Sequence, residues 1–395
     1  MKPLEGLKVV DLSRILAGPF CTMILADMGA EVIKVENPEG GDDTRGWGPP
    51  FLDGESGYYL SINRNKKSLT LNLKAPRGKE SLTDLIRQAD VLTENFRPGT
   101  MEKLGFGYEA VRVLNPRLIY VSISGFGQTG PDAMRPGYDL IVQGESGLMS
   151  ITGDPEGPPT KVGTSIADIV AGMYAVQGIA LALLARERTG RGQYVDIALL
   201  DSMVSLLTYQ AGIYFATGQS PKRMGNLHPT ITPYEPFQAS DGYFTVAVGN
   251  DQLWIRFCKA LGREELSTDP RFVTGAKRVE HRVALRCILE PELRKRPVAE
   301  WLSVLNEAGV PCGAIRSLAE VFASAQLQAR EMVVDAPHPK LGSVRVTGVP
   351  IKLSETAGTV VSHPPMLAEH TAEVLKSWLG MPEEAVTALR QEGVV

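Results

Sequence analysis

The sequence predicts an α/β protein whose first two hundred residues form a mostly parallel β-sheet covered by helices. Short apolar runs alternate with helical patterns along this stretch, which is the order expected for strands joined by crossover helices. The chain has 395 residues, of which 43% are hydrophobic and 22% charged. This length and composition are typical of a globular protein with a large core and about two domains.

Five strands and two of the helices between them are expected in this first part. The strands are LKVVDLS, AEVIKVE, KSLTLNL, ADVLTEN and RLIYVSIS, and the helices are PFCTMILADMG, which Gly29 ends, and GKESLTDLIRQ. Ligands of parallel sheets bind beyond the carboxyl ends of the strands. The residues expected there are Ser13, Arg14, Glu36, Asn37, Glu94, Asn95, Phe96, Ser124 and Gly125.

A nicotinamide-dependent dehydrogenase is the competing class for such a sheet. Its fingerprint is G-x-G-x-x-G directly after the first strand, where glycines let the backbone approach a pyrophosphate. Here that segment is SRILAGPF, with one glycine. Glu36 stands where a ribose-binding acid would, but without the glycines the sequence disfavours a dinucleotide site.

A second, smaller α+β domain is expected after Gly225. PYEPFQASDGYFTVAVGNDQLWIRFCKALG predicts two strands joined by an Asp-Gly turn, then a helix, and helical patterns continue through VAEWLSVLNEAGVPCGAI. The tail from APHPKLGSVRVTGVPIKLSE has strand character and then a helical pattern. The expected division is 1–200, a linker at 201–224, a small domain at 225–315, and a returning tail at 316–395.

Charge and cysteine content restrict the function. The formal net charge is −4, which argues against partners such as nucleic acid or an anionic membrane surface. The four cysteines are scattered and without metal-ligand spacing, so we expect reduced thiols, a cytoplasmic location and no metal. The sequence runs at once into a strand pattern, which leaves no room for a signal peptide.

One carboxylate stands out in KVGTSIADIVAGMYAVQGIALALLARERTG, where Asp168 heads a long apolar helix. The helix could span a membrane by length, but its Asp168 and Gln177 and its many small residues favour a buried core helix. Ser165 and Asp168 have the spacing of a capping box, and an acid here also complements the helix dipole. From the local sequence alone a capping role is the more probable interpretation of Asp168.

Eight motifs in order resemble the class III CoA-transferase family, over essentially the whole chain. They are DLSRILAGPFCTMILADMGAEVIKVENPEGGDDTRGWGPPF, NRNKKSLTLNLK, ENFRPG, GFGQTGP, GYDLIVQ, TSIADIVAGMYA, TGRGQYVDIALLDS and LAEHTAEVLK. The family includes formyl-CoA transferase and succinyl-CoA:glutarate CoA-transferase, and α-methylacyl-CoA racemases are related to it. The resemblance implies two interlocked chains in a homodimer. Each chain would have a Rossmann-like large domain built from both termini.

The resemblance implies that Asp168 is the nucleophile that attacks a thioester, through a mixed anhydride and an aspartyl-CoA thioester. The acyl-CoA is then a substrate, and no permanently bound cofactor is expected. A helix start keeps the pKa of a carboxylate low, so capping and catalysis are compatible. A non-catalytic CoA-binding paralogue is the alternative, and the presence of Asp168 disfavours it.

The segment Gly137-Tyr138-Asp139 separates transferase from racemase. Related racemases have Gly-His-Asp there, with the histidine exchanging the α-proton. A phenol with a pKa near 10 is a poor base at neutral pH, so Tyr138 favours a transferase. Tyr138 is therefore a candidate catalytic residue, and a packing aromatic is the alternative interpretation.

Binding residues are carried over from the family one position at a time. The expected CoA contacts are Leu16 and Ala17 at the thioester end, and Leu71, Lys74, Asn95, Phe96, Arg97 and Lys103 along the adenosine and phosphates. Asn37 replaces an arginine of formyl-CoA transferase. Arg64, Lys66 and Lys67 form a basic turn, which either contributes to CoA binding or is a solvated surface turn. The expected contacts of the acid substrate are Trp47, Tyr58, Asp139 and His228.

The acid substrate is predicted to be a dicarboxylate. The segment GNLHPTITPYEPFQ lacks the glycine run of formyl-CoA transferase, and with GGDDTRGWGPPF it most resembles the succinyl-CoA:glutarate branch. A second carboxylate would need a basic partner. The sequence offers Arg45, Arg64 and His228 without ranking them.

Overall fold

The computed structural model describes residues 1–395 and divides into two units. The large unit comprises residues 1–148, 162–212 and 325–395, and the small unit comprises residues 149–161 and 213–324. Residues 149–161, assigned to the large domain from the sequence, group with the small unit instead. The reason is that Arg223 donates to the carbonyls of Asp154 and Gly157, and the Gly225 N–H donates to Gly153.

The large unit is built on a six-stranded parallel sheet in the order β5-β2-β1-β6-β7-β8. Its strands are β1 (Lys8–Asp11), β2 (Glu31–Glu36), β5 (Lys66–Thr70), β6 (Val91–Glu94), β7 (Ile119–Ser124) and β8 (Tyr194–Ala198). The five expected strands are confirmed, and β8 is an additional edge strand. The order reverses between β1 and β6, so the crevice beyond these two strands is where ligands of such sheets bind.

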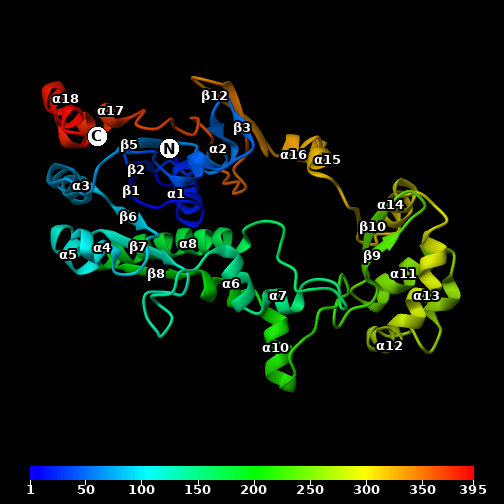
Figure 1. Cartoon of the computed structure of the whole chain (residues 1–395). Helices are drawn as coiled ribbons and strands as arrows, with labels where there is room; N and C mark the ends of the chain where they lie inside the picture. The colour runs from blue at the N-terminus through cyan, green and yellow to red at the C-terminus, as the bar shows by residue number, and fades with distance from the viewer. The chain divides into compact units, whose positions relative to one another are not determined.

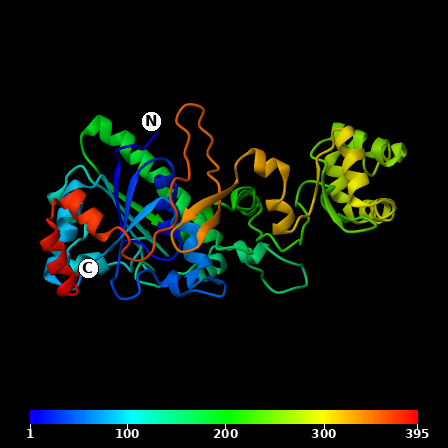
Figure 2. The ribbon, with the colours of Figure 1, turned by 90° about the horizontal axis from the view of Figure 1, so that it is seen from above.

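Helices cover both faces of the sheet (Figures 1 and 2). One face carries α1 (Ala17–Asp27), α6 (Asp139–Glu145), α8 (Ile166–Thr189) and α9 (Leu199–Ser205). The other carries α3 (Pro76–Gln88), α4 (Thr100–Leu104), α5 (Tyr108–Leu114), α17 (Thr371–Leu379) and α18 (Glu383–Gln391). The C-terminal helix α17, red in Figure 1, thus packs beside α3 from the first quarter of the chain.

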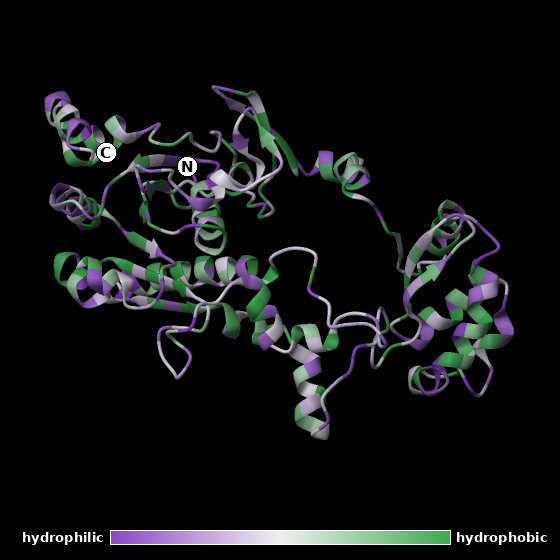
Figure 3. Cartoon of the chain, viewed as in Figure 1, coloured by the Kyte–Doolittle hydropathy of each residue, from purple (hydrophilic) through white to green (hydrophobic).

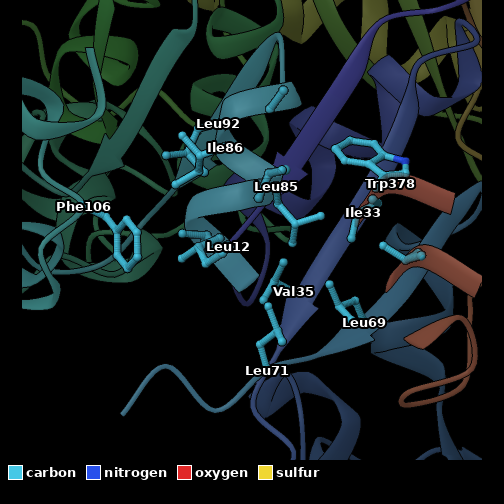
Figure 4. Close-up of a cluster of buried hydrophobic side chains, with 14 of the residues drawn as sticks. Leu12, Ile33, Val35, Leu69, Leu71, Leu85, Ile86, Leu92, Phe106 and Trp378 are labelled. Atoms are coloured by element: carbon cyan, nitrogen blue, oxygen red, sulfur yellow. The ribbon is translucent and has the colours of Figure 1, made fainter. Parts of the chain in front are cut away.

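The core on this second face is mainly aliphatic and includes three buried aromatic residues, Phe106, Tyr120 and Trp378. Figure 4 shows Leu85 and Ile86 of α3 over Ile33 and Leu92 of the sheet, with Trp378 of α17 at the edge. Leu85 and Ile86 are fully buried. Burial of each of these side chains contributes about 1.5–3 kcal/mol of transfer free energy. Trp378 of α17 belongs to the same cluster, so the C-terminal helices complete the core of the sheet.

The large unit also has smaller elements around the sheet. They are η1 (Asp43–Gly46), β3 (Phe51–Leu52), β4 (Glu55–Ser56) and α2 (Gly57–Ile62) after β2, then α7 (Leu148–Ile151), α10 (Thr208–Thr217), α16 (Ala325–Ala329) and the hairpin of β12 (Val333–His338) and β13 (Gly342–Thr347). Of these, α7 and α10 cross from one unit into the other. The strand character expected in the tail corresponds to β12 and β13.

The small unit is an antiparallel sheet packed against helices. Its strands are β9 (Tyr234–Gln238), β10 (Tyr243–Ala247) and β11 (Cys312–Ala314), and its helices are α11 (Asp251–Leu261), η2 (Glu264–Ser267), α12 (Gly275–Glu280), α13 (Arg282–Leu293), α14 (Val298–Glu307) and α15 (Leu318–Phe322). The hairpin and its following helix are confirmed. The helical pattern expected through VPCGAI is wrong, because these residues pair with β10 as an edge strand.

Helix α8 is, by length and composition alone, apolar enough to cross a membrane, and it is the one such helix in the structure. A core helix of a globular protein passes the same test. Its small residues Ala167, Ala171 and Ala175 are fully buried in the core against α1, whereas Leu181 and Leu184 are exposed. Figure 3 shows hydrophobic, green stretches along this helix. One side of the helix is therefore core, and other positions leave large apolar side chains exposed.

Candidate active site

Two cavities of the large unit meet where the strand order reverses. Pocket A, about 390 Å³, is lined by residues that follow β1, β2 and β5, and pocket B, about 350 Å³, by residues that follow β1, β6 and β7 and by Asp168. Both are lined by Arg14 and Phe96, whose guanidinium carbon lies 5.6 Å from the ring centroid. The two pockets are therefore neighbouring parts of one crevice, separated by this pair.

Most of the residues predicted for a ligand site do line these pockets. Pocket A is lined by Leu71, Lys74 and Phe96, and pocket B by Leu16, Ala17, Asn95, Phe96, Arg97, Tyr138 and Asp168. Asn37, in place of an arginine, also lines pocket A. Lys103, Trp47 and Asp139 line neither pocket, and His228 belongs to the small unit.

Close packing of α8 on α1 brings Asp168 to pocket B. Gly172, one helical turn after Asp168, lies against the start of α1, and a Cβ there would be 2.7 Å from the carbonyl oxygen of Ala17. Only glycine allows this approach without a shift of the backbone. The first turns of the two helices thus share one wall of the pocket, and the Asp168 carboxylate and the Leu16–Ala17 backbone line it together.

The capping box expected at Ser165 and Asp168 is wrong. The Ser165 side chain makes no capping hydrogen bond, although Ser165 is the N-cap of α8. The backbone N–H of Ala167 instead donates to Asp139 Oδ1 at 2.9 Å. Asp139 lies 28 residues earlier, on α6, so the cap of α8 is a long-range contact that no local sequence pattern contains.

The pKa of Asp168 is raised to about 7, contrary to the low value expected from its helix position. Burial is the main cause, and the charge of Asp139 adds to it. No cationic side chain lowers the pKa of Asp168 in this structure. The carboxylate is therefore both ionisable near neutral pH and unusually basic, which suits a nucleophile.

The turn before α1 has a strained backbone held by polar contacts. Ile15 has φ of +71°, which is rare for a β-branched residue. Its N–H donates to the Asp42 carboxylate at 3.2 Å. Asn95 accepts the Arg14 N–H at 2.8 Å and donates to the Arg14 carbonyl at 2.7 Å. The Asn95 amide is therefore engaged with this turn, so its effect on a ligand acts through the turn.

Sequence reasoning missed two residues that support this turn, Lys34 and Asp42. Lys34 Nζ donates to Asp42 Oδ2 at 2.7 Å and to the Ser13 carbonyl at 2.9 Å, and neither charged group is exposed. Burial opposes ionisation of Asp42, but Lys34 lowers its pKa below the usual value. The available signal was a lysine in the middle of the buried strand EVIKVE.

Tyr58 and Tyr138 present phenol groups near Asp168. The Tyr58 hydroxyl bonds the Ser165 side chain, and burial followed by the charges of Asp168 and Asp139 raises its pKa to about 12. Trp47 packs edge-on against Tyr58 with ring centroids 5.3 Å apart. Tyr138 lines pocket B and is 63% exposed, so the interpretation of Tyr138 as a packing aromatic is wrong.

The basic turn and two of the three candidate carboxylate partners are engaged internally. Arg64 pairs with Asp27 at 2.7 Å, Lys66 with Asp11 at 3.3 Å, and Lys67 with Glu31 at 2.8 Å. Arg45 forms two 2.8 Å hydrogen bonds to Glu36. Arg45 and Arg64 are therefore held in ion pairs within the large unit. His228, the third candidate, belongs to the small unit.

The structure contains no cluster of side chains with the arrangement of a metal site. No set of three or more His, Cys, Asp or Glu side chains is arranged to hold an ion. All four cysteines are free thiols, and Cys287 is exposed. The polar groups that line the crevice include the Asp168 carboxylate, the Tyr138 phenol and the basic side chains of Arg14, Lys74 and Arg97.

Comparisons with known proteins agree with the sequence motifs. A family model described as CoA-transferase family III matches residues 4–371. The chain is 43% identical over its whole length to succinyl-CoA:glutarate CoA-transferase of Mus musculus, covering 91% of that protein. It is 47% identical to acetyl-CoA:oxalate CoA-transferase of Acetobacter aceti over 353 residues, with 89% of each chain covered.

A solved structure agrees as well. The crystal structure of a CAIB/BAIF family protein from Brucella suis matches with a TM-score of 0.86 and 45% identity, covering 95% of this chain and 99% of that one. The family that the sequence motifs indicated is thus confirmed by sequence and by fold: the chain belongs to CoA-transferase family III, whose members are class III CoA-transferase enzymes.

Proposed function

We propose that the protein moves CoA from an acyl-CoA thioester to a free dicarboxylic acid, with Asp168 as the covalent nucleophile. The observation that carries this proposal is the position of Asp168 in the crevice. It is a carboxylate without a cationic partner, in the wall that the first turns of α1 and α8 share. A carboxylate in that setting is reactive toward an acyl group, whereas an ion-paired one is not.

The reaction is a sequence of balanced acyl transfers. Asp168 attacks the thioester carbonyl, a C–O bond forms, the C–S bond breaks, and a mixed anhydride and CoA thiolate result. The thiolate attacks the Asp168 carbonyl, giving aspartyl-CoA thioester and the donor acid. The acceptor carboxylate then attacks this thioester, and the released thiolate attacks the acceptor acyl carbon. The products are a new acyl-CoA and the original Asp168 carboxylate, with no hydrolysis.

The oxyanion of each tetrahedral state needs hydrogen-bond donors. The backbone N–H groups of Leu16 and Ala17, at the positive end of the α1 dipole, are our candidates. The phenol O–H groups of Tyr138 and Tyr58 are further donors near Asp168. The strained turn at Ile15 keeps this donor set in place, which is how strain at a functional site acts.

CoA is a substrate in this proposal, and no resident cofactor is required. Pocket A takes the adenosine and phosphates, with Leu71 and Lys74 as contacts, and pocket B takes the thioester end. Arg97 lines pocket B, and we propose that it contacts the part of CoA that runs from pocket A to the thioester end. Lys103 lines neither pocket, and we retain it only as a longer-range positive charge.

The acid substrate is proposed to be a dicarboxylate. Support comes from the names of relatives, which include succinyl-CoA:glutarate and succinyl-CoA:mesaconate CoA-transferases. Arg45 and Arg64 are paired internally with Glu36 and Asp27. His228 belongs to the small unit, and burial and the charge of Arg282 lower its pKa, so none of the three sequence-derived candidates offers a free cation to the second carboxylate. Trp47 and Tyr58 are proposed to contact the acid from the side of α2.

We further infer a cytoplasmic homodimer without membrane or nucleic-acid partners. The exposed apolar side chains of α8, Met173, Leu181 and Leu184, support burial against a second copy. The cytoplasmic location rests on the free cysteines, one of them exposed, which fit a reducing compartment. The net charge of −4 supports the absence of nucleic acid.

Replacing Asp168 by Asn tests the function. We expect transfer from succinyl-CoA to glutarate to fall by at least about a thousandfold in Asp168→Asn, because the amide cannot form the anhydride. Hydroxylamine added to the wild type during turnover should modify Asp168 alone, read by peptide mass spectrometry. Full activity in the variant, or trapping on another residue, would refute the assignment.

A further inference from the structure

The first turn of α8 is fastened to α6 by two side chains. Asp139 Oδ1 accepts the Ala167 N–H at 2.9 Å, and Asp139 Oδ2 accepts a hydrogen bond from Gln143 Nε2 at 2.8 Å. Gln143 is fully buried, and its Oε1 accepts the Val162 N–H at 2.9 Å. Gln143 and Asp139 thus hold both the segment entering α8 and the residue before Asp168.

The helix has no cap of its own that could replace these contacts. The Ser165 side chain accepts a hydrogen bond from none of the free N–H groups of the first turn, and it bonds the Tyr58 side chain instead. A lost N-cap costs about 1 kcal/mol of local stability, enough to fray a first turn. Because Asp168 stands in that turn, fraying would displace its carboxylate from the start of α1.

The charge of Asp139 also acts on Asp168. Burial is the larger cause of the raised pKa of Asp168, and Asp139 is the second cause. Other ionisable groups face the same space: Tyr58 from α2 interacts with both carboxylates, and Arg14, Arg97, Arg135 and Tyr138 line pocket B. None of these cations lowers the pKa of Asp168. Asp139 is therefore the one charged side chain that shifts this pKa, and it raises it.

We propose that Asp139 is a positioning residue for the nucleophile, which it serves by fastening the first turn of α8 and by facing Asp168 with a like charge. This inference rests on the proposed function of Asp168. It changes the role expected for Asp139 from a substrate contact to a support of the helix. Asp139 lines neither pocket, which agrees with a role behind the reacting carboxylate.

The variant Asp139→Asn removes the charge of Asp139 and keeps the contact with Ala167, but it turns the contact with Gln143 into one between two N–H donors. Its amide oxygen can still accept the Ala167 N–H, while the uncharged group no longer disfavours ionisation of Asp168. We expect the pKa of Asp168 to fall by roughly one unit from about 7. We expect kcat at pH 8 to fall about tenfold, because the amide repels Gln143 Nε2 and loosens the turn.

Two readouts test this in the full chain. A water-soluble carbodiimide with glycinamide labels protonated carboxyl groups, so the labelling of Asp168 between pH 5 and 9 gives its midpoint by peptide mass spectrometry without turnover. The pH profile of kcat/KM for transfer gives a second midpoint. Both should move to lower pH in Asp139→Asn, while KM for the acyl-CoA changes less than about threefold because Asp139 does not line either pocket.

Gln143→Leu is the companion variant, since it removes the hold on Asp139 but keeps the charge. Its midpoint should stay at the wild-type value while kcat falls, and it decides the question if Asp139→Asn does not fold. The matched control is Asp84→Asn, an exposed acid on α3 paired with Arg87.

An unchanged labelling midpoint in folded Asp139→Asn would overturn the inference, and so would full kcat in Gln143→Leu. The outcome is distinguishable from failure of the proposed function, which Asp168→Asn and trapping decide by themselves.

Discussion

Buried carboxylates stand on both sides of the crevice, and they have opposite character. On the β1–β2 side, Asp11, Glu36 and Asp42 have lysine or arginine partners, and their pKa values are lowered despite burial. On the β6–α8 side, burial raises the pKa values of Glu94 and Asp168 to about 7, and no cation opposes it. Burial is common to both sides, so at this crevice the direction of the pKa shift follows the presence of a cationic partner.

The largest effect that could break this comparison is expected on the structural side. Lys34→Met leaves the buried carboxylate of Asp42 without its cation, and we expect the free energy of unfolding to fall by about 3–5 kcal/mol. Urea unfolding at pH 7.5 measures it, with exposed Lys295→Met as the control. A loss below about 1 kcal/mol would mean that the ion pair does not stabilise this side.

The next prediction concerns a basic side chain that would bind the second carboxylate of the acid substrate. A dicarboxylate gains a charge-assisted hydrogen bond that a monocarboxylate of equal length lacks, worth about 1.5–3 kcal/mol. We expect glutarate to be preferred over valerate by roughly ten- to hundredfold in kcat/KM, in competition for one succinyl-CoA pool. An equal or inverted preference would indicate an apolar acid pocket.

A smaller effect tests the reactive side by stability. Since the pKa of Asp168 is raised to about 7 when folded and is near 3.9 in unfolded chains, folding disfavours its ionised form. Asp168 therefore makes the wild-type protein lose stability as pH rises from about 4 to 7, and this contribution is absent in Asp168→Asn, which keeps that of Glu94. At pH 8 we expect the variant to be more stable by about 2 kcal/mol in thermal or urea unfolding, with the gap closing near pH 4. A less stable variant at pH 8 would contradict this.

The smallest expected effect is none at all. With Tyr138 where related racemases have histidine, the Gly-Tyr-Asp segment lacks the imidazole that exchanges the α-proton in those enzymes. Incubation of a 2-methylacyl-CoA in deuterated water should give no enzyme-dependent deuterium at the α-carbon by mass spectrometry. Incorporation at the rate of acyl transfer would assign the reactive side to proton exchange.

Periodicity and turn residues were sufficient to predict most of the large sheet, the hairpin of the small unit and the segments that meet at the crevice. Strand β8 was missed because the only turn residues that separate it from its neighbours are Gly190 and Gly192, before the strand. Helix α9 begins directly after it. The family motif led us to propose Asp168 as the nucleophile, since the local pattern favoured a cap.

What the sequence could not provide were contacts between distant residues. The Asp139–Ala167 cap, the Lys34–Asp42 support of Ile15, and the pairing of Arg64 with Asp27 each join segments that are separate in the chain. The pKa of Asp168 was predicted with the wrong sign for the same reason. A helix dipole is visible in a sequence, but burial and a facing carboxylate from another helix are not.

The division of the crevice by Arg14 and Phe96 has a consequence for the order of events in the proposed reaction. A CoA molecule that keeps its nucleotide part in pocket A is tethered while the thioester end in pocket B is remade. Its thiolate then attacks at a high effective concentration, of the order of molar or above, without diffusing back from solution. The donor acid can leave and the acceptor can enter past a sulfur atom that never becomes a free reactant.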